Sequence, residues 1–292
     1  MVQILANKRR GPSPDDVYQD LLIDNAFKRI FGQQGRERLM MGLLRCLLPE
    51  LDIVWLEYLP NEGNNFGSDT KKSVYDVRCR LADGSFIIVE VQRSPQAYFA
   101  DRILYYGSMQ IANQKAIGDV SYELYPVYII SILDFCAQHG PDWVPKICSR
   151  YRIVELNGED VFTAKLQIIL VELGRFNKDL ENCKTFEEKV YYCMRNMYLL
   201  EGQPSELNDE FFDELFTVTR VESMRAEEKT LYIKSMTTEI DIRNQIAYAR
   251  EEGRTQGEAE GILQTAKKLL SAGVAMDIIM QCTGLDKNTI LG

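Results

Sequence analysis

The sequence is poor in histidine, and this scarcity limits the chemistry that it can support. His139 is the only histidine in 292 residues, so a Ser-His-Asp or Cys-His nucleophile system would depend on this one side chain, in the loop-like stretch AQHGPDW. A metal site rich in histidine is excluded. Any metal must be held by oxygen atoms, which favours hard cations such as Mg²⁺, Mn²⁺ or Ca²⁺.

Paired cysteines and long apolar runs are missing as well. The seven cysteines are odd in number and never spaced as CxxC, which predicts free, mostly buried thiols in a reducing cytoplasm rather than a zinc knuckle or a disulfide framework. No segment reaches the roughly 20 unbroken apolar residues of a membrane span. The first stretch, MVQILANKRRGPSPDD, lacks the apolar core of a signal peptide. We therefore expect a cytoplasmic protein with no membrane partner.

A surplus of positive charge is also absent. The net charge is −9, and the two halves of the chain differ: residues 1–150 carry 17 Lys and Arg against 18 Asp and Glu, whereas residues 151–292 carry 17 against 25. The acidic excess therefore lies in the C-terminal half. Short basic clusters that could form a modest patch for nucleic acid occur at residues 8–10, 28–29, 36–38 and 71–72.

The order of the predicted elements indicates an α/β fold. Helical periodicity appears twice within residues 15–48 and returns over residues 96–118. Apolar and β-branched content predicts strands at 51–60, on both sides of a turn within 73–92, at 125–135 and at 166–173. This order favours a mixed sheet flanked by helices.

From about residue 176 the sequence predicts helices only. We divide the chain into a core at 1–175, a helical region at 176–250 and a C-terminal helical tail at 251–292. Glycines recur every four residues from 253 to 261, and a unit with helix-turn-helix spacing follows. Because the second half of this unit has one lysine against two aspartates, it is poorly suited to phosphate contact. We expect these helices to form a homo-oligomer by self-association, or to act as a packing cap, rather than to read DNA.

The stretch SVYDVRCRLADGSFIIVEVQ (73–92) places acidic side chains in two otherwise apolar strands. Period-two alternation puts Asp76 on one face of the first strand, and Glu90 and Gln92 on one face of the second. A two-residue turn would send Asp76 and Glu90 to opposite faces of the sheet. A three-residue loop at 83–85 would pair Asp76 with Gln92 and bring both acids to one face. A shared site therefore requires an odd-length loop or a bulge.

Two neighbouring carboxylates repel each other unless a proton or a cation lies between them. With the odd-length loop, Asp76 and Glu90 lie within reach of one divalent cation, and the Val91 carbonyl is a candidate third oxygen. Such a cation would polarise a phosphodiester and lower the pKa of a bound water. The alternative is a solvated hairpin with an incidental acidic pair. The apolar run FIIVEVQ argues against it, because a glutamate in a buried strand needs a partner.

These residues resemble a known nuclease motif. Asp76 before a hairpin and Glu90-Val91-Gln92 after it are similar to the PD-(D/E)xK motif, although Tyr75 stands in place of the proline. More narrowly, the chain resembles the recombination-promoting nuclease/transposase (Rpn) family over roughly residues 15–292. The stretches that carry this resemblance are DNAFKRIFG (24–32), YDVRCRLADGSFIIVEVQ (75–92), ADRILYYGSMQ (100–110) and YPVYIISILDF (125–135).

The resemblance implies a restriction-endonuclease-like core and a metal-dependent DNA endonuclease that promotes recombination. Asp76, Glu90 and the Val91 carbonyl would hold Mg²⁺, with Mn²⁺ or Ca²⁺ as alternatives. Gln92 replaces the motif lysine, so it could orient the attacking water but would bring no positive charge. Asp24, on the first helix, is a water-mediated metal ligand or, equally, a surface residue or the i,i+4 partner of a lysine. The alternative function is a weak or inactive nuclease-fold protein that binds DNA or protein, and RNA is the alternative substrate.

Further side chains are candidates for contact with nucleic acid. Those that could supply the missing positive charge are Lys28, Lys71, Lys72 and Arg78. A polar stripe at four-residue spacing follows on the helix after Glu90, and it comprises Arg102, Tyr106, Gln110 and Gln114. A plain solvated face is the alternative for this stripe, above all for its glutamines.

Overall fold

The computed structural model describes residues 10–61, 75–115, 120–156, 158 and 160–291. The chain divides into two compact units, Met1–Thr237 and Thr238–Gly292. This division differs from the boundaries near residues 175 and 250 that composition suggested. The reason is that helices beyond residue 185 contribute buried side chains to the same core as the sheet.

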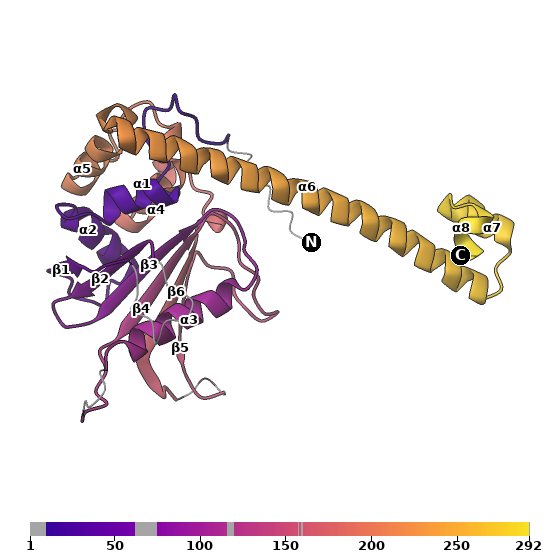
Figure 1. Cartoon of the computed structure of the whole chain (residues 1–292), viewed down its shortest axis with the longest axis horizontal. Helices are drawn as coiled ribbons and strands as arrows, with labels where there is room; N and C mark the ends of the chain where they lie inside the picture. Colours follow the sequence, from indigo (N-terminus) through magenta and orange to yellow (C-terminus); the bar gives the residue numbers. More distant parts are fainter. Residues whose placement is uncertain (1–9, 62–74, 116–119, 157, 159, 292) are drawn as a thin grey trace. The chain divides into compact units, whose positions relative to one another are not determined.

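A six-stranded mixed sheet forms the centre of the first unit (Figure 1). Its strands are β1 (Leu56–Tyr58), β2 (Val77–Leu81), β3 (Phe86–Gln92), β4 (Val127–Leu133), β5 (Cys148–Ile153) and β6 (Thr163–Glu172). In space the order is β1-β2-β3-β4-β6-β5. The central strands β3, β4 and β6 run parallel, whereas β1, β2 and β5 pair antiparallel with their neighbours. Central position explains the apolar sequences of β3 and β4, because helices cover both faces of these strands.

The helices are α1 (Asp24–Phe31), α2 (Glu37–Leu47), α3 (Phe99–Ala112), α4 (Phe186–Asn196), α5 (Glu210–Thr219), α6 (Ala226–Ser271), α7 (Met276–Thr283) and α8 (Lys287–Leu291). Single 3₁₀ turns occur at Leu173–Arg175, Leu180–Asn182, Met197–Leu199 and Val221–Ser223. Figure 1 shows α1, α2, α4 and α5 on one side of the sheet and α3 on the other. The α/β fold with a mixed sheet between helices, and with helices at the C-terminus, is as predicted.

Alternation along β3 separates two apolar cores. Ile87 and Val89 face the large core that the sheet shares with α1, α2, α4 and α5. Ile88 faces a smaller core that includes Ile103 of α3. Side chains at even positions of β3 therefore lie on the α3 face of the sheet. The acidic residue Glu90 belongs to this even set.

The β2–β3 hairpin has a loop of odd length. The Leu81 N–H donates to the Ser85 carbonyl at 2.9 Å, so three residues, 82–84, form the loop. Gly84 in this loop has a φ of +87°, a conformation that glycine adopts without the steric cost of a Cβ atom. The prediction of an odd-length loop is confirmed, but the loop begins one residue earlier than the predicted 83–85.

This earlier loop changes the pairing of the acidic residues. Val77 pairs with Val89, and continuing the register by one residue brings Asp76 opposite Glu90. The predicted pairing of Asp76 with Gln92 is therefore wrong. Both acids still share the α3 face, because moving the loop by one position changes the register by two residues and preserves the face.

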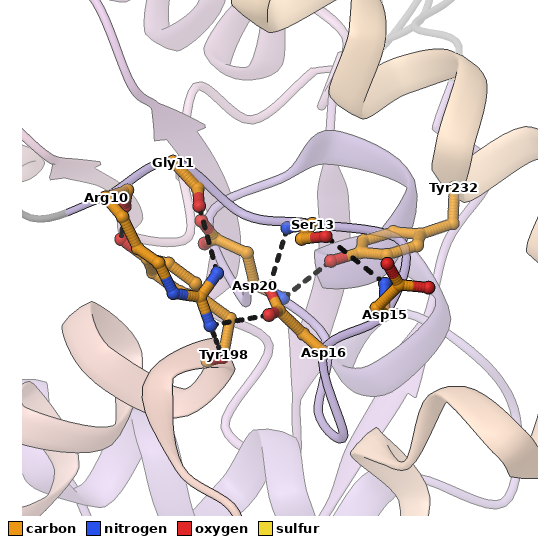
Figure 2. Close-up of polar contacts among 8 residues, drawn as sticks. All are labelled: Arg10, Gly11, Ser13, Asp15, Asp16, Asp20, Tyr198 and Tyr232. Atoms are coloured by element: carbon orange, nitrogen blue, oxygen red, sulfur yellow. Dashed lines mark hydrogen bonds and ion pairs between the residues drawn. The ribbon is translucent and has the colours of Figure 1, made fainter.

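The segment before α1 is not helical, contrary to the expectation for residues 15–23. Gln19 N–H donates to the Thr219 carbonyl at 2.9 Å, and Asp20 N–H donates to the Tyr232 hydroxyl at 2.9 Å. Figure 2 shows this segment, where Arg10 also forms an ion pair with Asp16 at 2.6 Å. These tertiary contacts take the backbone donors that a helix would use.

Two strands also differ from the prediction. The strand expected at 51–60 is limited to the three residues of β1, and β5 was not predicted.

The second unit is helical within its described residues. The last turns of α6 pack with α7 and α8 around Ala266, Ile279 and Ile290. The seven cysteines of the whole chain are free, and three of them, Cys79, Cys183 and Cys193, are buried. None of the described helices combines the length and apolar character that crossing a membrane requires.

Candidate active site

Two carboxylates meet on the α3 face at the C-terminal end of β3. The Asp76 N–H donates to Glu90 Oε1 at 3.2 Å, and the Val91 N–H donates to Asp76 Oδ2 at 2.8 Å. Glu90 is only 5% exposed, and the Asp76 side chain is 15% exposed. The structure thus brings Asp76, Glu90 and Val91 together.

The end of the β2–β3 ladder explains how Asp76 reaches Val91. Ladder bonds from the hairpin place the polar groups of Val91 on the β2 side of β3. β2 has no partner for them, because the Tyr75 N–H turns away and donates to the Asn61 carbonyl at 2.9 Å. The Asp76 carboxylate takes the Val91 N–H instead. The Val91 carbonyl lies on the same edge of the strand as this N–H, so it faces the Asp76 side.

Both carboxyl groups have raised pKa values. Burial raises the pKa of Asp76 to about 7, and the neighbouring Asp24 carboxyl adds to this shift. Burial raises the pKa of Glu90 to about 8, with the Asp76 charge as the second cause. Because each carboxyl disfavours the charge of the other, they titrate as a pair. Near neutral pH and without a cation, this pair retains protons.

Lys28 connects the first helix to the pair. Its Nζ lies 2.6 Å from Asp24 Oδ1 and 3.3 Å from Asp76 Oδ1. The i,i+4 pairing considered for Asp24 is therefore present, and the same carboxyl also acts on Asp76. One ammonium therefore interacts with three carboxyl groups, since the Lys28 charge also lowers the pKa of Glu90. When all three are ionised, the cluster carries a net negative charge that attracts a cation.

The residues at this site fit a hard divalent cation. Glu90 Oε2 makes no hydrogen bond to the described residues, and Gln92 Oε1 is buried without a partner there. Two carboxylates and the Val91 carbonyl supply oxygen only, as Mg²⁺ prefers, and Mg²⁺ commonly keeps several waters. Among the residues that the structure describes, no group of three or more His, Cys, Asp or Glu side chains is arranged to hold a metal. Protein ligands would therefore complete only part of the coordination shell.

The sequence model of the PD-(D/E)XK nuclease family transposases matches residues 21–249. The chain belongs to this family. Neither the curated proteins nor the solved structures gave a match. The match includes α1, the β2–β3 hairpin and α3, so all elements that form the site lie within it. The resemblance deduced from the motif is confirmed, and membership of a transposase-type nuclease family implies DNA as the substrate.

Two polar residues at this candidate site were missed in the sequence. Ser131 of β4 lies beside Glu90 in the parallel register, and its fully buried hydroxyl has no partner within the described chain. The Asn61 Nδ2 donates to the Asp76 carbonyl at 3.0 Å. The one available signal for Ser131 was a polar residue within the apolar run YIISIL. Its position beside the acid depends on strand register, which sequence alone does not give.

Arg78 lies two residues after Asp76 on the same face. Its Nε donates to Gln110 Oε1 at 2.7 Å, and its Nη1 donates to the Pro60 carbonyl at 3.4 Å. Burial lowers the pKa of this guanidinium. No carboxylate pairs with Arg78 in the described part of the chain, which leaves its charge for an external anion. Gln110 is buried by this contact, so it positions Arg78 rather than facing solvent.

The rest of the predicted stripe divides into two groups, because α3 ends at Ala112 and Gln114 lies beyond the helix. Arg102 lies near enough for its charge to lower the pKa of Glu90, and the Tyr106 ring packs edge-on against the Tyr75 ring with centroids 5.0 Å apart. Gln114, by contrast, binds the backbone of Tyr125 through both ends of its amide, so its role is structural. Lys71 and Lys72 lie outside the described residues.

Proposed function

We propose that this chain is a divalent-cation-dependent endonuclease that hydrolyses DNA phosphodiester bonds, with promotion of recombination as its biological role. The observation that supports this function is the pair formed by the buried Glu90 and the half-buried Asp76, with the Val91 carbonyl at the same edge. Burying two adjacent carboxylates is unfavourable unless a proton or a cation neutralises them. The chain belongs to a nuclease family, and nucleases act on phosphodiesters, so a cation bound between these two carboxylates would have a catalytic use.

Each residue has a distinct part in the proposed reaction. Asp76, Glu90 and the Val91 carbonyl hold Mg²⁺ or Mn²⁺. The chemistry that a bound divalent cation supplies is polarisation of the phosphodiester and acidification of water. Gln92 follows Glu90 on the same face, and its buried Oε1 accepts a hydrogen bond from the attacking water. Asp24 assists from α1, through its contact with Asp76.

Lys28 supplies the positive charge that Gln92 cannot. Its Nζ already lies 3.3 Å from Asp76, although it comes from α1 rather than from β3. Burial lowers the Lys28 pKa, and the charges of Asp76 and Asp24 more than offset this, so the net direction is upward. The ammonium is therefore charged at neutral pH and stabilises negative charge on the phosphate.

Nicking of supercoiled plasmid DNA tests the proposal. We expect the purified protein to nick plasmid with Mg²⁺ and to be inactive with EDTA. Asp76→Ala should reduce the rate at least about 100-fold, since it removes a ligand of the cation. Asp101→Ala is the matched control, because Asp101 is an exposed acid on α3 outside the cluster. Equal nicking by the Asp76 and Asp101 variants would disprove the assignment.

The replacement of the motif lysine by Gln92 favours a second candidate, a nuclease-fold protein that binds nucleic acid without cutting it. It predicts DNA binding that persists in EDTA, with no nicking under any cation. Single-stranded DNA and RNA in the same assay test the substrate class. The free thiols fit the reducing cytoplasm as the site of action.

A further inference from the structure

Tyr98 is an aromatic residue in a backbone conformation that costs it energy. Its φ is +59° and its ψ is +27°, in the left-handed region, and it is the one non-glycine residue with positive φ in the described chain. It precedes the first turn of α3 and forms no side-chain cap there. Glycine or asparagine would satisfy this conformation at lower cost. Strain of this kind persists at positions where the side chain has another use.

The Tyr98 ring is also placed where a ligand can reach it. The residue is 81% exposed, and its side chain makes no hydrogen bond or ring contact with the residues that the structure describes. Burial and packing therefore do not account for the aromatic ring. Tyr98 lies six residues after Gln92, at the end of the segment 93–98 that leads from β3 into α3, and the last four residues of this segment are exposed.

Arg102 connects this ring to the active site. The two residues are one helical turn apart, and the Arg102 N–H donates to the Tyr98 carbonyl at 3.0 Å. The Arg102 guanidinium has an amide partner, Gln96 Oε1 at 2.5 Å, and no carboxylate partner among the described residues. The same guanidinium lies over the Phe99 ring, 5.9 Å from its centroid. A guanidinium without a carboxylate partner, near Glu90 and one helical turn from the exposed Tyr98 ring, matches a nucleotide that presents one phosphate and one base.

We propose that Tyr98 and Arg102 bind an unpaired nucleotide of the DNA next to the scissile bond, with the Tyr98 ring stacked on its base and Arg102 on its phosphate. This inference rests on the proposed function for its substrate class. The base must be unpaired, because stacking on neighbouring bases covers both faces of every base in a duplex. An unpaired base leaves one face free to stack on the Tyr98 ring. The preferred substrate is consequently DNA with a single-stranded stretch at the cut, such as a gap, an overhang or a displaced strand.

The test measures binding without cleavage. Fluorescein-labelled DNA of about 20 nucleotides is titrated with full-length protein in Ca²⁺, both as a single strand and as a blunt duplex of the same sequence. The proteins are the natural sequence, Tyr98→Phe, Tyr98→Ala and Tyr98→Gly. We expect Ala and Gly to weaken single-strand binding about tenfold or more and to leave duplex binding unchanged. Phe retains the ring and should bind as the natural protein does.

The glycine variant separates stacking from strain. Tyr98→Gly relieves the left-handed backbone, so we expect a higher melting temperature together with weaker single-strand binding. Unchanged single-strand binding by Tyr98→Gly would overturn the proposal, as would equal losses on single strand and duplex. Absence of single-strand binding by the natural protein would also overturn it. Plasmid nicking reports the proposed nuclease separately: Tyr98-dependent binding without any nicking would reject the nuclease and keep the nucleotide site.

Discussion

At the scale of single residues, the site depends on carboxyl groups that the fold keeps away from water. Glu90 is buried, the adjacent Asp76 is half-buried, and Lys28 offsets only part of their charge. A protonated pair is one stable state, and a cation-bound pair is the other. Protons and a cation therefore compete for the same two carboxyl groups, so cation binding depends on pH.

We expect the metal-free protein to lose stability as pH rises. Because folding raises the pKa values of Asp76 and Glu90 to about 7 and about 8, the folded state holds protons that the unfolded state has already released. The stabilisation is complete below the unfolded pKa values, near 4, and is lost as pH rises through 7 and 8. At about 1.4 kcal/mol for each pKa unit, the two shifted groups set an upper limit of roughly 7 kcal/mol on the loss between about pH 5 and pH 9.

Urea unfolding in EDTA across this pH range measures the effect, and added Mg²⁺ should restore stability mainly at the alkaline end. Asp76→Asn is the control, because it keeps an acceptor for the Val91 N–H and removes one titrating group. Its stability should depend less on pH. Identical pH profiles for the variant and the natural protein would rule out the pair as the cause.

At the scale of secondary-structure elements, the hairpin loop sets the site. The hypothesis of a shared site, together with sequence alternation, required an odd-length loop, since only odd lengths bring Asp76 and Glu90 to one face. It was insufficient to choose between 82–84 and 83–85, because Gly84 fits the positive φ of either loop. Which of the two loops forms depends on tertiary contacts of the loop residues, and these contacts cannot be deduced from the local sequence pattern.

Gly84→Ala tests how strongly these contacts hold the loop. A Cβ at this position would lie 2.3 Å from the Tyr125 ring, in addition to the strain at φ +87°. Gly35→Ala is a matched control, since Gly35 has a φ of +83° and no atom within 4 Å of a built Cβ. We expect Gly35→Ala to cost about 1 kcal/mol and Gly84→Ala about 1 to 3 kcal/mol more, measured by urea unfolding. Equal costs would mean that Tyr125 gives way and does not fix the loop.

The elements that sequence predicted best are those whose pattern reflects burial. β3, β4 and β6 are apolar because helices cover the sheet, and α4 to α6 follow periodicity. The failures are segments ordered by distant partners. Residues 15–23 have a helical pattern, yet Tyr18 bridges to Arg220, about 200 positions along the chain. Likewise, Ser131 joins the site through the pairing of β3 with β4. Tyr98 differs from other tyrosines by its positive φ angle, which cannot be deduced from the residue type.

At the scale of the whole molecule, the C-terminal unit leaves apolar side chains uncovered. Ile278 of α7 is 51% exposed and Leu291 of α8 is 57% exposed, although the unit has its own small core. We propose that these residues pack against a second copy of the chain. Two copies would then present two candidate active sites, one for each strand at a locally unpaired stretch of DNA.

Light scattering of the full-length protein tests this assembly. We expect a dimer or larger species for the natural chain and a monomer for Ile278→Glu, because burying a carboxylate in an apolar interface is costly. Gln281→Glu adds the same charge on an exposed position of α7 without removing an apolar side chain, so it should remain associated. Since the substitution lies outside the unit that contains the active site, Ile278→Glu should still nick plasmid and should lose mainly the conversion of nicked to linear DNA. A natural chain that is monomeric at micromolar concentration would refute self-association through this unit.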